Sequence, residues 1–247
     1  DRSIRSEADE LAQSILDLMS YDIRMTGNGA PDTNNWHMGV AAASDFAYPI
    51  NHYVSNSTFI AIGYSKTGKY TAISADVTPN GGFWVANVLD PTIFKVGDLA
   101  FFNATSIGQE HAGGALVVGV TGNTLTFFYS VYSTGAVYNN GTMINVIDTV
   151  AYNSPTDWSG ITRGYEGITS PIARNTTFNI SYLNSAGSSI TLNATTERDT
   201  LATIEVTVYA RGRSTLHDGS TYTAWAKQRV RPIFLHLSRQ QSWSPTQ

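Results

Sequence analysis

The residues with the strongest potential for chemistry lie in a glycine-rich stretch, Gly-Gln-Glu-His-Ala-Gly-Gly, at positions 108–114. Glu110 beside His111 offers a carboxylate and an imidazole, two groups that serve in general acid–base catalysis. Adjacent residues on a strand point to opposite faces, so the two groups would not converge on one substrate. A glycine-rich hairpin is the better interpretation, and the chain has no Gly-x-Ser-x-Gly nucleophile elbow.

Metal ligation is the second chemistry to consider. The segment at 27–35 offers oxygen ligands at Asp32, Asn34 and Asn35, but it lacks the spacing and the glutamate of an EF-hand loop. The histidines do not have the spacing of a zinc motif, and their positions are His37, His52, His111, His217 and His236. The chain also has no cysteine. We therefore expect no catalytic residue, no metal site and no cofactor.

The composition narrows the class of protein further. Charged residues make up 14% of the 247 residues, against about 25% in an ordinary soluble domain. Serine, threonine, asparagine, glycine and tyrosine take their place, and these residues favour strands joined by turns. The net charge of −4 provides no basic face, so we expect no stable binding of nucleic acid.

The first 25 residues have the periodicity of an amphipathic helix. Apolar residues recur at spacings of three and four, and the predicted buried stripe is Ile4, Ala8, Leu11, Ile15, Leu18 and Met25, widened by Ala12 and Met19. Ser3 or Ser6 is the expected N-cap. Gly27 and Gly29 then supply the left-handed conformation that ends a helix, and Pro31 prevents its return.

The rest of the chain has the pattern of antiparallel strands. Turn residues at 65–69, 121–124, 184–187 and 217–219 separate runs that are apolar or alternating. The run at 203–211 alternates most clearly, with Ile204, Val206, Val208 and Ala210 on one face. We predict an α+β fold, in which a helix of residues 1–27 packs on the antiparallel sheets of a β-rich domain at 28–247.

Four stretches of this sequence together resemble one protein family. The predicted helix ends as LDLMSYDIRMTG from Leu16 to Gly27. FKVGDLAFF follows at 94–102, GYEGITSPIARNTTFNISY at 164–182, and TIEVTVYARGRS with RVRPIFLHLSR at 203–239. In this order the stretches resemble type IV minor pilins and type II secretion pseudopilins of the PilW/J type, and the helix end is the most specific of them.

The resemblance implies a structural, non-enzymatic subunit with a pilin-like helix that takes part in priming, capping or assembling a filament. Other minor and major pilins would be its partners. A preceding apolar segment would anchor it in the inner membrane of a bacterial cell envelope, before assembly at the cell surface or in the periplasm. The polar face of the helix would provide the contacts between subunits, through Arg5, Glu7, Asp9 and Glu10.

Asp22 and Arg24 stand on the last turn of the predicted helix, where the helix dipole disfavours an aspartate. We expect the Asp22 carboxylate to accept hydrogen bonds from backbone N–H groups or from a basic side chain of the following loop or sheet. Arg24 would help to satisfy the carbonyl groups that the glycine stop leaves free. The alternative is that both are solvated surface charges.

A carbohydrate- or host-binding adhesin domain is the alternative function. Aromatic side chains in the loops can stack on a sugar ring, and the candidates are Trp36, Tyr48, Tyr53, Trp84 and Tyr138. The same residues can instead fill small cores beneath long loops. A hydrolase, the third class, has no set of residues to support it.

The resemblance also predicts what precedes Asp1 in the gene. We expect a short basic leader, a Gly-Phe-type cleavage site and about 20 apolar residues directly upstream. Sequencing the complete gene checks this expectation. A removable signal peptide followed by an unrelated domain would contradict it.

Overall fold

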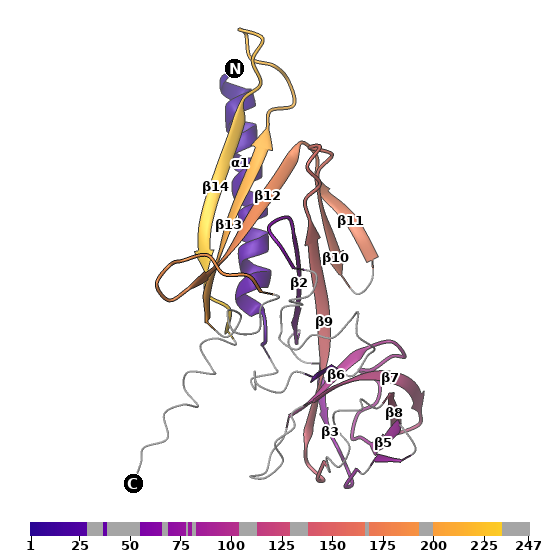
Figure 1. The fold of residues 1–247 in the computed structure, drawn as a ribbon. Coiled ribbons are helices and arrows are strands. Elements are labelled where there is room, and N and C mark those ends of the chain that lie inside the picture. The colour runs from indigo at the N-terminus through magenta and orange to yellow at the C-terminus, as the bar shows by residue number, and fades with distance from the viewer. Residues whose placement is uncertain are drawn as a thin grey trace. The chain divides into compact units, whose positions relative to one another are not determined.

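A computed structural model describes residues 1–28, 37–38, 55–65, 69–77, 79–80, 83–103, 113–128, 138–165, 168–192 and 200–233. Strands make up 50% of the described chain and helix 15%, nearly all of it in α1 (Arg2–Met25; Figure 1). The predicted pilin-like α+β class is therefore wrong, and the described protein is mostly β-sheet. The turn-rich, weakly charged sequence after the helix forms strands throughout its described length, and their pairing dominates the structure.

By its internal contacts the chain forms two compact units. The first comprises Asp1–Thr26, His52–Ile62 and Thr149–Leu235, and the second comprises Gly27–Asn51, Gly63–Asp148 and His236–Gln247. This grouping cuts across the predicted segments 1–27 and 28–247, because α1 belongs to the same unit as the C-terminal strands.

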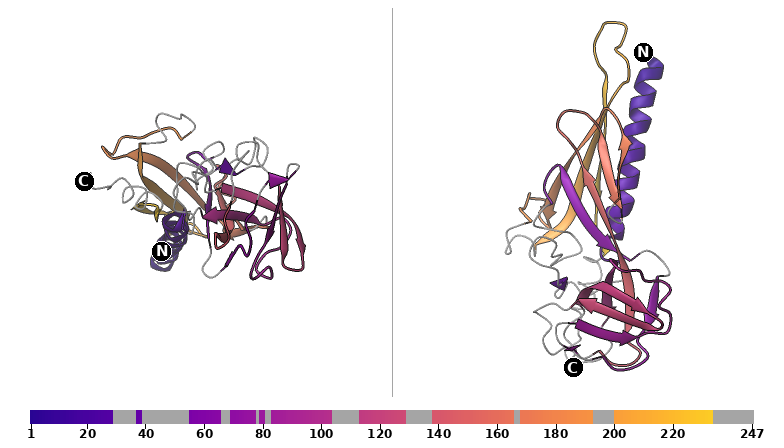
Figure 2. Two further views of the ribbon diagram at one scale, coloured as in Figure 1. Left: turned by 90° about the horizontal axis from the view of Figure 1, so that it is seen from below. Right: turned by 90° about the vertical axis from the view of Figure 1, so that its right-hand side faces the viewer.

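The first unit contains a three-stranded antiparallel sheet in the order β12-β13-β14, and α1 packs along one face of it (Figures 1 and 2). The predicted alternation at 203–211 is confirmed, because Ile204, Val206, Val208 and Ala210 are buried. In the same unit the last residues of β9 pair with β10, and β10 pairs with β11. The bounds are β9 (Met143–Asn153), β10 (Ile161–Tyr165), β11 (Ile168–Ala173), β12 (Thr176–Asn184), β13 (Leu201–Arg211) and β14 (Thr223–Val230).

The second unit contains strands in the order β9-β6-β7-β8-β5-β4, with β1 paired to β7 and β3 paired to β9. The predicted hairpin at 121–124 is confirmed, with Gly122 at a φ of 56° between β7 and β8. The turn predicted at 65–69 lies partly outside the described residues, and the strands on either side of it, β2 and β3, each pair with β9. The bounds are β1 (His37–Met38), β3 (Tyr70–Ala72), β4 (Pro79–Asn80), β5 (Phe83–Asn87), β6 (Leu99–Asn103), β7 (Gly113–Thr121) and β8 (Thr124–Phe128). The strand β2 (Phe59–Tyr64) begins in the first unit and ends in the second.

The buried stripe of α1 keeps Ala8, Ala12, Ile15 and Met19 of the predicted stripe, but it is rotated so that Leu16 and Ile23 take the place of Leu11 and Leu18. Its members are fully or almost fully buried, and they are Ala8, Ala12, Ile15, Leu16, Met19 and Ile23. Ile15 is buried as expected, whereas Leu11 is only half-buried and Leu18 is 39% exposed. The small side chains of Ala8 and Ala12 suit a helix backbone that lies close to the sheet, which favours this rotation over one centred on Leu11 and Leu18.

Two leucines on this helix allow a direct test of the rotation. Leu16→Ala should lower the free energy of unfolding by roughly 2–5 kcal/mol, because it leaves a cavity in a packed core. Leu18→Ala is the matched control, and it should cost less than about 1 kcal/mol because the side chain is already partly in water. Urea denaturation of both variants measures the difference. Equal losses, or a larger loss for Leu18→Ala, would show that the predicted stripe was the correct one.

Candidate functional site

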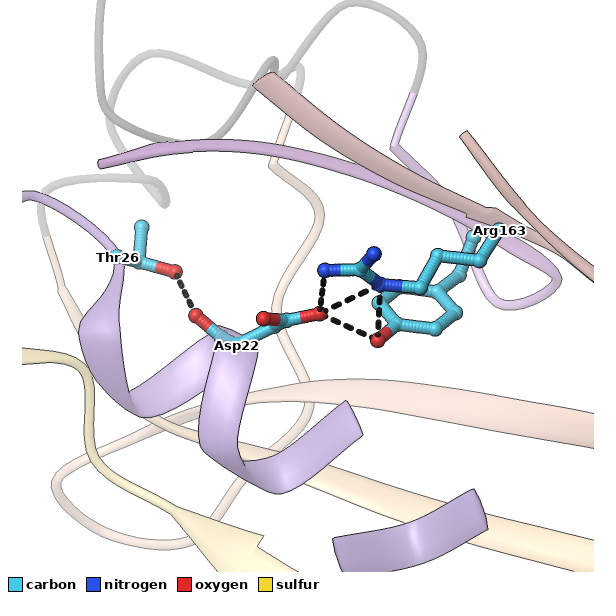
Figure 3. Close-up of polar contacts among 4 residues, drawn as sticks. Asp22, Thr26 and Arg163 are labelled. Carbon is cyan, nitrogen blue, oxygen red and sulfur yellow. Dashed lines mark hydrogen bonds and ion pairs between the residues drawn. The ribbon is translucent and has the colours of Figure 1, made fainter. Parts of the chain in front are cut away.

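The carboxylate of Asp22 lies buried at the C-terminal end of α1 and makes three polar contacts through one oxygen (Figure 3). The side chain is 1% exposed. Its Oδ2 atom lies 2.9 Å from both Nε and Nη2 of Arg163, and it accepts a hydrogen bond of 2.5 Å from the hydroxyl of Tyr152. The Arg163 Nε–H also donates to the Tyr152 hydroxyl oxygen at 3.1 Å. The expectation that Asp22 has a basic partner from the sheet is confirmed.

Two neighbouring strands place the partners of Asp22. Tyr152 on β9 and Arg163 on β10 stand directly opposite each other in the antiparallel pair, so their side chains share one face. The Arg163 guanidinium also lies 5.8 Å from the centroid of the Tyr152 ring and 5.4 Å from that of Tyr165. The strand pair therefore presents a fixed cation and a fixed donor to the end of the helix.

Burial and charge hold Tyr152 and Arg163 each in one protonation state. Burial raises the pKa of the Tyr152 phenol well above its ordinary value, and the Asp22 carboxylate raises it further. Burial lowers the pKa of the Arg163 guanidinium, but Tyr152 and Asp22 outweigh it, so the pKa is raised overall. Tyr152 thus stays a neutral hydrogen-bond donor and Arg163 stays a cation.

The helix ends just beyond this cluster. Thr26 Oγ1 donates to the Asp22 carbonyl at 3.3 Å (Figure 3), and the Thr26 N–H donates to the Ile23 carbonyl at 3.2 Å. Gly27 has a φ of 78°, which confirms the predicted left-handed stop, while Gly29 lies outside the described residues. Arg24 is exposed, and among the described residues Thr26 is the donor to two carbonyl groups of the last turn, those of Asp22 and Ile23.

The polar face of α1, which was expected to contact other subunits, meets the chain between β13 and β14. The Arg5 guanidinium lies over the Tyr222 ring at 5.3 Å, and the Tyr222 hydroxyl donates to Asp9 at 3.0 Å. Glu7 forms an exposed ion pair with Arg213 at 3.0 Å. Arg5, Glu7 and Asp9 are therefore engaged within the protein. Glu10 accepts a local bond from Ser6 and remains exposed.

A second apolar surface of α1 lies beside the buried stripe, and we call it the apolar edge. Ile4, Leu11, Leu18 and Met25 follow one another at intervals of seven residues, and Tyr21 lies beside this row. Leu18 is 39% and Tyr21 58% exposed, while the other three are half-buried. The members of the edge are Ile4, Leu11, Leu18, Tyr21 and Met25.

The aromatic and metal-ligating candidates are distributed as follows. Trp84 and Tyr138 are 2% and 1% exposed and belong to one aromatic core with Phe102 and Phe127, so they fill a core as the second interpretation proposed. Among the described residues no group of three His, Cys, Asp or Glu side chains could hold a metal ion. The remaining aromatic, metal-ligating and acid–base candidates lie outside the described residues, and these are Trp36, Tyr48, Tyr53, Asp32, Asn34, Asn35, Glu110 and His111.

Tyr152 and Arg163 are the site residues that sequence analysis missed. One signal for Arg163 was present, because the 173 positions from Met25 to Glu197 contain two arginines, Arg163 and Arg174. An isolated arginine on a strand in such a weakly charged region is a candidate partner for a poorly placed carboxylate. Nothing comparable distinguishes Tyr152 from the other 12 tyrosines of the chain.

Comparison with known proteins does not identify a family. No protein-family model matches the chain, and neither the curated proteins nor the solved structures compared with it give a match. Within the described residues no helical stretch is both long enough and apolar enough to cross a membrane.

The Asp22 cluster predicts a strong dependence of stability on one carboxylate. Asp22→Ala should lower the free energy of unfolding by about 3 kcal/mol, because it leaves the partly buried Arg163 cation without its partner. Asp17→Ala is the matched control on the same helix. Its exposed carboxylate accepts one bond from Gln13, so its loss should change stability by less than about 0.5 kcal/mol. Urea denaturation of the two variants measures the difference, and equal midpoints would show that the cluster is not a structural clamp.

Proposed function

We propose that this protein is a structural, non-enzymatic subunit of a filament in the bacterial cell envelope, of the kind that minor pilins and pseudopilins form. The apolar edge of α1 is the observation that carries the proposal. A helix that has already buried one apolar stripe against its own sheet has a second, partly exposed apolar surface available for another chain. Other pilins, minor and major, are the proposed partners, and the inner membrane is the proposed site of the subunit before assembly.

The spacing of the edge suits a helical partner. Side chains seven residues apart lie close to one line along a helix, and such a line packs into the grooves of a second helix. Leu18 and Tyr21 are its most exposed members, and Tyr21 adds a large aromatic side chain of the type enriched in protein interfaces. These contacts would bring together the helices of neighbouring subunits.

The Asp22 cluster links a contact at the apolar edge to the position of the strands β9 and β10. Because Asp22 ties the end of α1 to β9 and β10, the strands of the first unit are held in a fixed position relative to the apolar edge. A partner that seats on the edge therefore also sets the position of those strands. The proposal rests on α1 and this anchoring, and it does not require the α+β class that the fold excludes.

The adhesin alternative receives no comparable support. The two aromatic candidates among the described residues, Trp84 and Tyr138, are buried in the core of the second unit and present no face to a sugar. A stacking platform would need exposed rings.

Cysteine cross-linking in the organism tests the assembly role, because the chain has no cysteine of its own. Leu18→Cys and Tyr21→Cys, each placed in the full-length gene and labelled with a maleimide–benzophenone reagent, should form adducts with other filament subunits on irradiation, because the photoactivated benzophenone inserts into C–H bonds and needs no cysteine on the partner. The adducts should disappear in cells that lack the remaining pilin genes. Immunoblotting and mass spectrometry of the adducts identify the partners.

Leu89→Cys is the matched control, since Leu89 is an apolar residue that is 71% exposed and lies outside α1. It should label with a soluble maleimide but give few adducts. If Leu18→Cys and Tyr21→Cys label as readily as Leu89→Cys and give no adduct, the apolar edge faces solvent and the proposed function is wrong.

A further inference from the structure

The first unit contains a groove of about 570 Å³ between the N-terminal half of α1 and the strand β11. Glu7, Ala8 and Leu11 line it on the helix side. Pro171–Asn175 line it on the strand side, and Arg211–Arg213 complete it at the end of β13. The volume lies within the usual range for ligand sites, which is about 300–1,000 Å³.

Positive charge gathers in this groove although the chain as a whole is acidic. Three arginines and one glutamate line it, which gives a local charge of 3 − 1 = +2, whereas the whole chain carries −4. Arg174 is exposed and no acceptor for its guanidinium lies in the described part of the chain. Arg213 pairs with Glu7, but both side chains are exposed, so an incoming carboxylate can take the place of Glu7 at little cost.

The arginine at the end of β13 is held in place by stacking. The Arg211 guanidinium lies 3.7 Å from the centroid of the Trp158 ring, which engages its face and leaves its N–H edges for an acceptor. The described residues include two non-glycine residues with positive φ, Trp158 at 64° and Asn175 at 56°. One stacks on Arg211 and the other accepts the Arg211 backbone N–H at 2.8 Å, so both strained residues support this arginine.

Gly160 allows the loop that carries Trp158 to pack closely beside the groove. Gly160 has a φ of 120°, and a Cβ atom there would lie 2.1 Å from the Ala173 carbonyl oxygen. The loop that carries Trp158 therefore packs directly against the end of β11. Such pre-organisation lowers the ordering cost of binding a ligand.

The lining indicates the chemistry of the ligand. Guanidinium groups form paired hydrogen bonds with carboxylates and phosphates, while Leu11 and Ile172 provide an apolar surface that a bare inorganic anion cannot use. Pro171 has no N–H group to donate, so β11 is poorly suited to pair with an added strand. We therefore expect side chains to make the contacts with a ligand. The exposed carboxylate of Glu10 on the same half of α1 disfavours an anionic membrane surface.

We infer that this groove binds an extended acidic segment of a partner protein, in which carboxylate side chains alternate with apolar ones. Alternation places the carboxylates on one side of the segment, toward Arg174, Arg211 and Arg213, and the apolar side chains on the other. This interaction goes beyond the proposed filament contact, because it uses β11 and the end of β13. The groove shares Leu11 with the apolar edge, but it does not involve Leu18 or Tyr21.

Fluorescence anisotropy with a labelled hexapeptide of alternating glutamate and leucine tests the inference on the intact protein. The peptide should bind, and its affinity should fall with rising salt. A peptide with glutamine in place of glutamate should bind at least roughly tenfold more weakly, because charge-assisted hydrogen bonds are lost. Arg174→Gln and Arg211→Gln should each weaken binding of the acidic peptide by roughly tenfold, with circular dichroism unchanged.

Arg231→Gln is the matched control, since it removes an exposed arginine outside the groove and should leave the affinity unchanged. Equal loss in Arg231→Gln, or equal affinity for the glutamine peptide, would overturn the inference. So would displacement of the peptide by inorganic phosphate at equal concentration, or arginine-dependent binding to phosphatidylglycerol vesicles in place of the peptide. Cross-linking at Leu18 tests the filament role separately, so the two proposals can fail independently.

Discussion

A single buried carboxylate constrains how the first unit is built. Asp22 lies where both burial and the negative end of the helix dipole oppose a negative charge. Such a charge is stable only with a cation and further donors close by, and Arg163 and Tyr152 supply them from adjacent strands. The end of α1 must therefore lie against β9 and β10, and the rest of the helix follows from that position and from its packing on β13 and β14.

The orientation fixed in this way divides α1 into three surfaces with different roles. The stripe that includes Ala12, Leu16 and Ile23 is buried in the core, and the polar face around Asp9 meets Tyr222. What remains is the apolar edge, which neither the sheet nor the chain before β14 covers completely. A helix designed only to cover its own sheet would carry polar residues on that edge, because exposed apolar side chains gain nothing from water.

Sequence patterns predicted the local features of this structure better than its overall class. The helix end at Gly27, the alternation in β13 and the need of Asp22 for a basic partner all follow from short-range rules about dipoles, glycine and strand periodicity. The identity of that partner depends on a contact across 141 positions, which no local pattern encodes. The predicted position of the buried stripe on α1 was wrong in part, for a related reason. Periodicity gives the spacing of apolar residues, but the packing surface decides which of two adjacent rows is buried more deeply. Here Leu16 and Ile23 are buried in place of Leu11 and Leu18.

The two isolated arginines of the middle region show how one strand pair can serve both stability and recognition. Arg163 on β10 is neutralised by Asp22, so it adds structure but almost no external field. Arg174, directly after β11, meets no carboxylate among the described residues and contributes to the positive groove with Arg211 and Arg213. In a chain with a net charge of −4, an uncompensated positive site is where an acidic partner is attracted most strongly. An arginine therefore stabilises the first unit at the C-terminal end of α1, and another arginine is available to bind a partner near its N-terminal half.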